Sequence, residues 1–372
     1  MNKTKISAEV VADSLDSRGN RLTSLLITFP RIILAEINTH RMLSKNTSSS
    51  RAIPFKKMVE AVQNNPFIPI AWQKHHSGMQ GNEYHTGEGN VGDINYKARA
   101  ERNWLRARDF AVEQAKHLYE DSLITKQLAN RLLEPFMWTT MLITGSKEGW
   151  NNFFHLRCPQ YIDITQENIS YKSRKEFIDS FNERKLTGLP KKELDLKWLQ
   201  INKGQAEIHM MALAEEIYDA MNESTPIQLK PGEWHIPFAI EIINLYIKNK
   251  GYVPETEIPV DEFIKISTAM SAHTSYTIVG GEAVKSYEKW IELHDKLIAY
   301  DPPHSSPMEH CARAMSDEEY ESFRKGKHEV TLMDNTENQY WFIEDDSGEK
   351  GWCNNFKGFI PYRYFIDNKI EL

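Results

Sequence analysis

The clearest hydrophobic pattern near the start of the chain is an apolar run from Leu22 to Phe29, which Pro30 follows. A run of this length predicts a buried β-strand, and proline is well tolerated in the first turn of a helix. We therefore expect a strand and then a helix. The helix would end close to His40 and Arg41.

Three later segments carry apolar residues at helical spacing. They predict one or two helices over Lys97 to Leu133, an amphipathic core helix over Gln205 to Met221, and a helix over Ser286 to Tyr300. The positions expected to face the core are Trp104, Ala107, Phe110, Ala111, Gln114 and Leu118 in the first, Ile208, Met211, Ala214, Ile217 and Met221 in the second, and Trp290, Leu293, Leu297 and Ile298 in the third.

The segment from Phe136 to Arg157 is apolar and aromatic, and we expect Phe153, Phe154 and Leu156 to lie in the core.

The intervening segments show other patterns. Residues 64–95 are rich in Gly, Pro, His and Asn and predict a long loop. The mixed charge of residues 158–203 predicts a peripheral helical excursion, and the alternation over residues 330–343 predicts a β-hairpin.

Composition and charge narrow the function classes. The chain has 372 residues, 40% of them hydrophobic, and a formal net charge of −7. It has no long apolar run and no basic and apolar leader, so we expect no membrane span, no secretion signal and a cytoplasmic location. The negative charge argues against binding of nucleic acid polymers, because counterion release needs a cationic surface. Basic residues that interleave with acidic ones predict a solvated helix surface at Lys97, Arg99, Arg102, Arg106 and Arg108.

Cysteine and histidine residues do not predict a metal site. Cys158, Cys311 and Cys353 have no paired spacing, so neither a disulfide framework nor a zinc site is expected, and Cys158 is interpreted as an inert core residue. The histidines of the long loop lack a matching carboxylate or cysteine pattern and are interpreted as surface residues; they are His75, His76 and His85.

Residues 39–51 concentrate the chemistry of anion binding. Arg41 and Arg51 offer guanidinium forks that match phosphate or carboxylate, and Ser49 adds a hydroxyl donor. His40 can donate or accept a hydrogen bond near neutral pH. Such a mixture suits a nucleotide, although a basic Ser-rich run alone is also typical of a solvated loop.

These residues resemble a known signature. The order His40-Arg41, seven residues, Ser49 is similar to the Arg-His-Arg-x7-Ser motif of flavin-dependent thymidylate synthases, the ThyX family, with Thr39 in place of the first arginine. Further segments resemble motifs of the same family: Asn130-Arg131-Leu132-Leu133-Glu134-Pro135, Asn152-Phe153-Phe154-His155-Leu156-Arg157, Gly204-Gln205-Ala206-Glu207-Ile208, Ala272-His273-Thr274-Ser275-Tyr276 and His304-Ser305-Ser306-Pro307-Met308-Glu309-His310.

The order of these segments differs from the usual one. In the family, the segments that resemble 272–276 and 304–310 precede the Arg-His-Arg motif, whereas here they follow it. We interpret the chain as one catalytic domain over residues 1–372 that is circularly permuted, with a permuted segment over 265–363 and an insertion over 158–203; a rearranged pseudo-repeat is the alternative. Arg363 would then be available to replace the guanidinium that Thr39 lacks, although a surface arginine is the alternative.

The resemblance implies an α+β fold with an antiparallel sheet and surrounding helices. It implies reductive methylation of dUMP to dTMP with FAD, with NADPH and methylenetetrahydrofolate as co-substrates, in a homotetramer without nucleic acid or membrane partners. It assigns the nucleotide to Glu36, Thr47, Ser49, Arg51, Arg131 and Arg157, with catalytic roles for Ser49 and Arg157. It assigns the flavin to Thr39, His40, Arg41, Asn152, Ser275, His304 and Ser306, and it implies no metal.

Three departures from the family pattern leave the substrate open. Thr39 replaces an arginine, Glu36 replaces a glutamine and Thr47 replaces a glutamate. The alternatives are methylation or hydroxymethylation of dCMP, hydroxymethylation of dUMP, and a non-catalytic protein that binds flavin or nucleotide. For Arg157, a buried structural arginine remains the alternative to a ligand contact.

Overall fold

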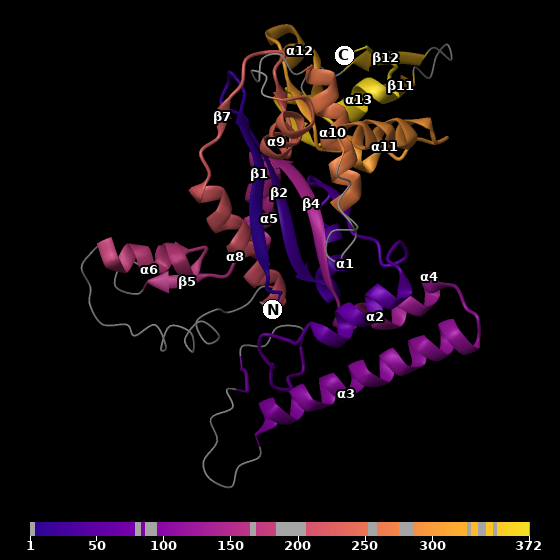
Figure 1. Cartoon of the computed structure of the whole chain (residues 1–372). Helices are drawn as coiled ribbons and strands as arrows, with labels where there is room; N and C mark the ends of the chain where they lie inside the picture. The colour runs from indigo at the N-terminus through magenta and orange to yellow at the C-terminus, as the bar shows by residue number, and fades with distance from the viewer. Residues whose placement is uncertain are drawn as a thin grey trace.

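The computed structural model describes residues 4–78, 83–85, 95–163, 169–183, 206–251, 259–274, 286–325, 329–333, 340–344 and 348–371. At its centre lies a five-stranded sheet in the order β3-β4-β2-β1-β7 (Figure 1). Its strands are β1 (Ser7–Leu15), β2 (Arg21–Pro30), β3 (Ser44–Thr47), β4 (Trp138–Ser146) and β7 (Ile227–Gln228). All neighbours are antiparallel except β1 and β7, so the predicted α+β class with an antiparallel sheet is confirmed.

The apolar run that predicted a buried strand forms β2. It is followed by a short 3-10 helix, η1 (Arg31–Ile33), and then by α1 (Leu34–Asn38), as the proline suggested. β2 pairs with β4 from Leu22 opposite Ser146 to Pro30 opposite Trp138. α1 therefore connects β2, inside the sheet, to β3 at its edge.

Two helices cover one face of this sheet (Figure 1). They are α5 (Lys147–Arg157) and α8 (Ile208–Glu223), and the five apolar residues predicted to face the core from α8 are all buried. On α5, Phe153 and Phe154 are buried as predicted, but the prediction for Leu156 is wrong, since its side chain is 44% exposed. Leu156 lies about 200° around the helix from Phe154, at 100° per residue, and so faces solvent.

The C-terminal third of the chain packs on the other face. Leu22 belongs to a buried cluster with Ala312, Ala314, Phe356 and Phe359 there. The elements of this part are β8 (Trp234–His235), α9 (Ala239–Lys250), α10 (Val260–His273), α11 (Tyr287–Ala299), η6 (Ser306–Glu309), β9 (Ala312–Ala314), α12 (Asp317–Ser322), β10 (Arg324–Lys325), β11 (Glu329–Met333), β12 (Tyr340–Glu344), β13 (Glu349–Lys350), β14 (Trp352–Cys353), β15 (Phe356–Lys357), β16 (Phe359–Pro361) and α13 (Tyr362–Asp367). The helix predicted over residues 286–300 forms α11, and β11 pairs with β12 as the predicted hairpin does.

The long helical segment packs below the sheet as drawn in Figure 1. It comprises α2 (Phe55–Asn64), α3 (Tyr96–Lys116), the π-helical turn η2 (His117–Asp121), α4 (Lys126–Ala129) and the 3-10 helix η3 (Asn130–Phe136). The helices are confirmed, but the core predictions for Ala107 and Phe110 are wrong: Ala107 is exposed and Phe110 is 62% exposed, while Val112 and Ala115 are buried. The buried side of α3 faces α2 and η3, and Phe110 lies about 200° from Val112.

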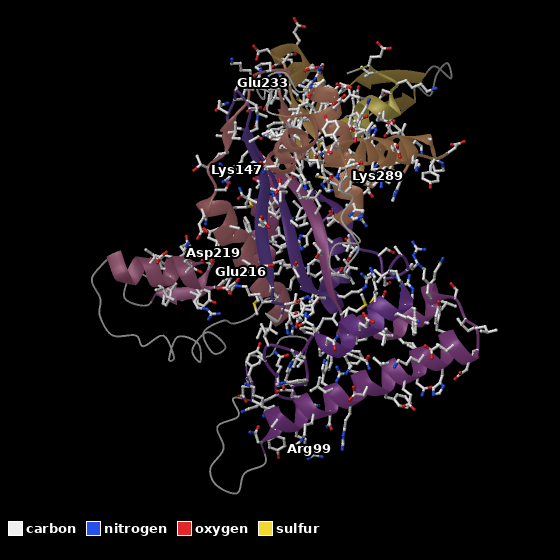
Figure 2. All side chains as sticks on the ribbon, in the orientation of Figure 1. Arg99, Lys147, Glu216, Asp219, Glu233 and Lys289 are labelled. Carbon is white, nitrogen blue, oxygen red and sulfur yellow. The ribbon has the colours of Figure 1, made fainter. Side chains whose placement is uncertain are left out.

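The charged face of α3 largely projects into solvent. Figure 2 shows Arg99 on the outer side of the helix, and Lys97, Arg102 and Arg106 are exposed as well. Arg108 instead donates to the backbone carbonyls of α2. The predicted solvated surface thus holds for all but Arg108.

The inserted segment is more than a helical excursion. Its described part contains a pair of short strands, β5 (Tyr161–Asp163) and β6 (Ile169–Tyr171), before α6 (Arg174–Glu183). These elements pack beside α8 at the periphery (Figure 1). Within the described part of residues 64–95, one isolated bridge joins Gln73 to Tyr84, in keeping with the predicted loop. No helix among the described residues is long and apolar enough to cross a bilayer.

A buried hydrogen-bond network runs across the sheet, on the face that the C-terminal part of the chain covers. The side chain of His235 joins Ser14 Oγ to Ser24 Oγ, at 2.9 and 2.8 Å, and Ser24 contacts Thr144 Oγ1 at 2.6 Å. Thr144 in turn contacts His310 Nδ1 at 2.8 Å. Burial lowers the pKa of His235 to about 4 and that of His310 to about 3, so both rings are neutral at physiological pH.

We predict that acid destabilises the protein through these rings. The unfolded chain binds protons near pH 6.5 while the folded rings stay neutral, so the free energy of unfolding falls as the pH drops from 6.5 to about 4. Each such ring contributes a slope of about 1.4 kcal/mol per pH unit. In urea titrations at a series of pH values, His235→Gln should reduce this slope by about 1.4 kcal/mol per pH unit, which corresponds to the uptake of one proton. The exposed His155→Gln is the matched control, and an equal slope in both variants would contradict the prediction.

Candidate functional site

The end of α1 is held in place by a lysine. Lys45 Nζ donates to the carbonyl oxygens of Ile37 and His40, at the C-terminal end of the helix, where a cation is favourable. Thr39 Oγ1 donates to the carbonyl of Glu36 at 2.7 Å. These contacts fix the backbone of the 39–41 segment, which the sequence identified as the anion-binding motif.

Two glycines let this segment approach α5. A Cβ on Gly145 would lie 2.3 Å from a methyl of Leu43, and a Cβ on Gly149 would lie 3.1 Å from the carbonyl oxygen of Met42. A larger residue at either position would push the 42–43 turn away. The absence of these side chains therefore allows residues 42–43 to pack against the end of β4 and the first turn of α5.

Arg157, the last residue of α5, meets the motif. Its Nε donates to His40 Nε2 at 2.9 Å. Its two terminal nitrogens lie 3.4 Å from Glu36 Oε2 and 3.4 Å from Thr39 Oγ1. The structure thus brings together four of the residues that the sequence singled out. The Arg157 side chain keeps 20% of its surface exposed, so it forms a wall of the site and not part of the core.

The electrostatics of this group keep His40 neutral. Burial and the charges of Arg157 and Lys45 lower the pKa of His40 to about 4. Since Nε2 accepts from Arg157, the proton of the neutral ring lies on Nδ1. Burial also lowers the pKa of Lys45 to about 8. For Glu36, burial and the nearby Glu207 raise the carboxyl pKa, and Arg157 acts in the opposite direction.

A second polar group fixes the end of the motif. Ser50 Oγ donates to Glu134 Oε1 at 2.6 Å, and the same oxygen lies 3.2 Å from Arg31 Nε and 3.5 Å from Arg131 Nη1. Asn130 Nδ2 donates to the carbonyl of Ser50 at 2.8 Å. Arg131, predicted to contact nucleotide, therefore lies near Glu134 through one terminal nitrogen of its guanidinium, while about half of its side chain remains exposed.

The side chains of β3 and of the residues that follow it, up to Arg51, alternate between a buried side and an accessible side. Ser44, Asn46, Ser48 and Ser50 are buried. Their neighbours in the alternation, including Thr47 and Ser49, are partly exposed, and Arg51 is exposed. The three nucleotide contacts predicted in this stretch are thus on the accessible side, as a period of two requires.

The C-terminal segment contributes to the same edge of the sheet. Ser306 Oγ donates to Asn46 Oδ1 at 3.2 Å, which brings a predicted flavin residue against β3. His304 is exposed, as are Arg41 and Asn152. Ser275 lies outside the described residues.

Arg363 lies close to this edge as well. Its guanidinium pairs with Glu309 and with Asp367, the latter at 3.1 Å, beside a polar pocket of about 290 Å³ that Ser44 also lines. Two carboxylates therefore pair with the charge of Arg363. The guanidinium that contacts the hydroxyl of Thr39 is that of Arg157.

The sequence did not single out Lys45 or Glu207 as site residues. Glu207 accepts from the backbone nitrogens of His209 and Met210 and so caps α8. Both residues lie inside segments that resemble family motifs, and this was the available signal. The effects of Glu207 on Glu36, and of Lys45 on His40, depend on distances that only the folded chain shows.

Comparison with known proteins gives partial likenesses. No protein-family model and no curated protein sequence matches the chain. Among solved structures, it is similar to the UMP/dUMP methylase PolB from Streptomyces cacaoi bound with 5-Br UMP, with 16% identity over 60% of this chain and 98% of that chain and a TM-score of 0.34. It is also similar to Thymidylate Synthase X (ThyX) from Helicobacter pylori with FAD and dUMP, with 13% identity over 48% of this chain and 73% of that chain and a TM-score of 0.24. The latter protein is of the family that the motifs resemble.

We predict that Arg157→Leu raises the pKa of His40 toward its ordinary value of 6.5, because the substitution removes a positive charge beside the ring. The measurement is an NMR titration of the histidine side-chain signals. Arg41→Leu is the control, since it removes a neighbouring charge that does not contact the ring. Equal shifts in the two variants would contradict the assigned contact.

Proposed function

We propose that the protein is a flavin-dependent thymidylate synthase of the ThyX type, which methylates dUMP at C5. The contact of Arg157 with His40, Glu36 and Thr39 carries the proposal. These residues come from two segments that each resemble a family motif and lie more than a hundred positions apart. If the matches to the motifs were random, the two segments would not be expected to contact each other in the folded chain.

The nucleotide would bind through its phosphate. Guanidinium forks and hydroxyl groups are the donors that suit a phosphate dianion. The accessible side of the motif offers Ser49 and Arg51, and η3 offers Arg131. Arg157 would complete the set from α5. In the resemblance, Ser49 and Arg157 have the catalytic roles, and here they would orient the pyrimidine ring.

The residues present also fit a flavin. The neutral His40 ring carries a proton on Nδ1 that can be donated to a carbonyl or ring nitrogen, and Arg41, Asn152 and His304 are accessible donors. When bound, FAD supplies the redox chemistry and methylenetetrahydrofolate the one-carbon unit, with NADPH as reductant. FAD and dUMP are also named for the Helicobacter pylori structure, but the proposal is based on the side chains of this chain.

The expected setting follows the family. We propose one catalytic domain that is circularly permuted and that acts as a cytoplasmic homotetramer, in which neighbouring chains complete each site. The hydrogen bond from Ser306 to Asn46 supports the single permuted domain, because the C-terminal motif lies beside the N-terminal one despite their distance in sequence.

One observation favours a cytosine nucleotide as a second candidate substrate. Glu36 occupies the place of a family glutamine, and an ionised carboxylate only accepts hydrogen bonds. The amino group of cytosine is a donor at the position where uracil carries an acceptor. Methylation or hydroxymethylation of dCMP would therefore suit Glu36 better than Gln. A non-catalytic flavin-binding protein is the remaining alternative.

A mass-spectrometric assay tests these proposals together. The purified protein is incubated with FAD, NADPH and methylenetetrahydrofolate, and with either dUMP or dCMP. Methylated dUMP supports the first proposal and modified dCMP the second. In the second case, Glu36→Gln should shift turnover toward dUMP. A colourless protein that ignores added FAD and modifies neither nucleotide would overturn both.

We predict that Arg157→Ala and Arg51→Ala each weaken nucleotide binding while the protein stays folded. Loss of a charge-assisted contact to phosphate costs about 1.5–3 kcal/mol, or roughly one to two decades in affinity. Calorimetric titration with dUMP and dCMP measures the effect. Arg102→Ala, at an exposed position of α3, is the control. If Arg157→Ala lowered stability alone and left affinity unchanged, its role would be structural.

We predict that no cysteine takes part in the reaction. All three cysteines are buried, and burial raises the pKa of Cys158 strongly and that of Cys311 and Cys353 to about 12. A thiol in this state is a poor nucleophile. Cys158→Ala should retain most turnover, and iodoacetamide should not inactivate the protein in a way that nucleotide prevents. A loss of several decades in turnover with FAD binding intact would require a covalent mechanism.

A further inference from the structure

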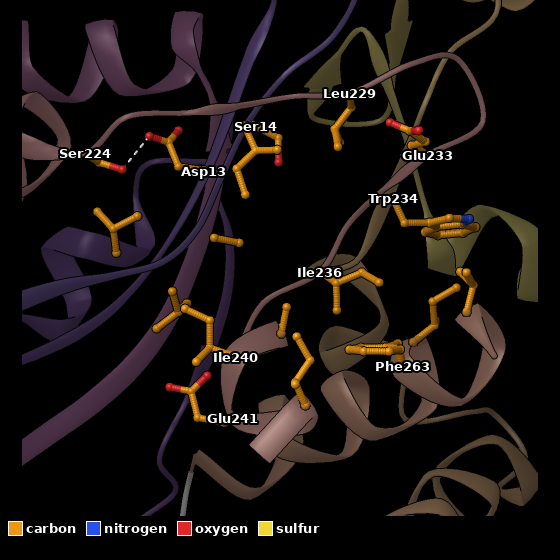
Figure 3. Close-up of a pocket in the computed structure, with 18 of the residues that line it drawn as sticks. Asp13, Ser14, Ser224, Leu229, Glu233, Trp234, Ile236, Ile240, Glu241 and Phe263 are labelled. Carbon is orange, nitrogen blue, oxygen red and sulfur yellow. Dashed lines mark hydrogen bonds between the residues drawn. The ribbon is translucent and has the colours of Figure 1, made fainter. Parts of the chain in front are cut away.

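A large cavity in the described part of the chain lies away from the proposed site. It has a volume of about 1050 Å³ and lies between β1, the 224–241 segment and the start of α10 (Figure 3). The proposed site lies at β3, whereas β1 is close to the opposite edge of the sheet. Val10, Ile236 and Phe263 are among its apolar lining residues. A volume of this size accommodates a small organic molecule.

The charges around this cavity have one sign. Its described lining residues include five carboxylates and no lysine, arginine or histidine. Two of the five are already neutralised, since Asp13 pairs with Arg21 and Asp261 with Lys265. The other three, which have no ion-pair partner among the described residues, are Glu9, Glu233 and Glu241.

Apolar side chains remain exposed at the mouth. Ile227, Ile240 and Val260 are 69%, 73% and 51% exposed. Figure 3 shows Glu233 next to the indole of Trp234 at one end of the cavity and Glu241 next to Ile240 at the other. Each end therefore offers a carboxylate beside an apolar surface, and an aromatic face attracts cations as well.

We infer that this cavity binds a small organic cation with an apolar body. The apolar walls would remove the body of the ligand from water, and a carboxylate without an ion-pair partner at either end would attract its ammonium group. Nucleotide, flavin and folate are anions, and the same carboxylates would repel them. The cavity is therefore a second site, separate from that of the proposed reaction.

Octyltrimethylammonium, used below its micelle concentration, is a suitable probe because it combines a cation with an alkyl chain. Isothermal titration calorimetry should show saturable binding at one site per chain. Octyl sulfate has the same chain with the opposite charge, and we expect it to bind at least about tenfold more weakly because its charge is repelled. Equal affinities for the two probes would overturn the inference.

Variants locate the site. The double substitution Glu233→Gln with Glu241→Gln should weaken binding of octyltrimethylammonium about fivefold, as expected for the loss of two solvent-exposed charge contacts. Ile240→Lys should weaken it further by adding a cation at the mouth. Glu60→Gln, at an exposed position of α2, is the matched control and should change nothing. An unchanged affinity in the double variant would show that the probe binds elsewhere.

The measurement does not depend on the proposed reaction. Probe binding in a protein that takes up no FAD would refute the proposed function and leave this inference standing. A protein that methylates nucleotide but does not discriminate between the two probes would refute the inference alone.

Discussion

Strands β2 and β4 pair along their whole length, from Leu22 opposite Ser146 to Pro30 opposite Trp138. This register fixes two chain segments that are more than a hundred residues apart relative to each other, and the antiparallel strands lead into them from opposite ends of the pair. β2 leads into α1 and the His40 motif, and β4 leads into α5 and Arg157. A shift of the register by one residue would turn every side chain of one strand to the opposite face, and both the core and the contact of Arg157 with His40 would be lost. The site thus depends on backbone pairing as much as on its own side chains.

Much of this framework could be predicted because the relevant patterns are local. An apolar run that ends in proline defined β2 and the helix after it, and the helical spacing of five apolar residues defined α8. The residues of the site were accessible to sequence reasoning for a different reason. Arg157, His40, Glu36 and Thr39 lie in segments that resemble motifs, so their types and spacing could be compared even though no local rule predicts that they meet.

The predictions that were wrong concern what covers a helix. Phe110 and Leu156 both fit an apolar pattern but are exposed, because the neighbours of α3 and α5 lie on other sides of those helices. The network from Ser14 to His310 was also out of reach of the sequence. Its hydroxyl and imidazole groups come from three strands and two C-terminal segments, and isolated serines and histidines carry no periodic signal. Buried polar groups of this kind are identified by their partners, and these follow from tertiary packing.

The distribution of charge gives the two edges of the sheet different chemistry. The net charge of −7 would repel anionic ligands at long range, and the motif at β3 offsets it locally with Arg41, Arg51 and Arg157. Neutrality of His40 matters here, because a charged ring would compete with Arg157 for Glu36 and would remove the acceptor that orients the guanidinium. Beside β1, carboxylates without an ion-pair partner among the described residues leave the negative charge in place. This distribution of charge would direct ligands of opposite sign to separate sites on one small sheet.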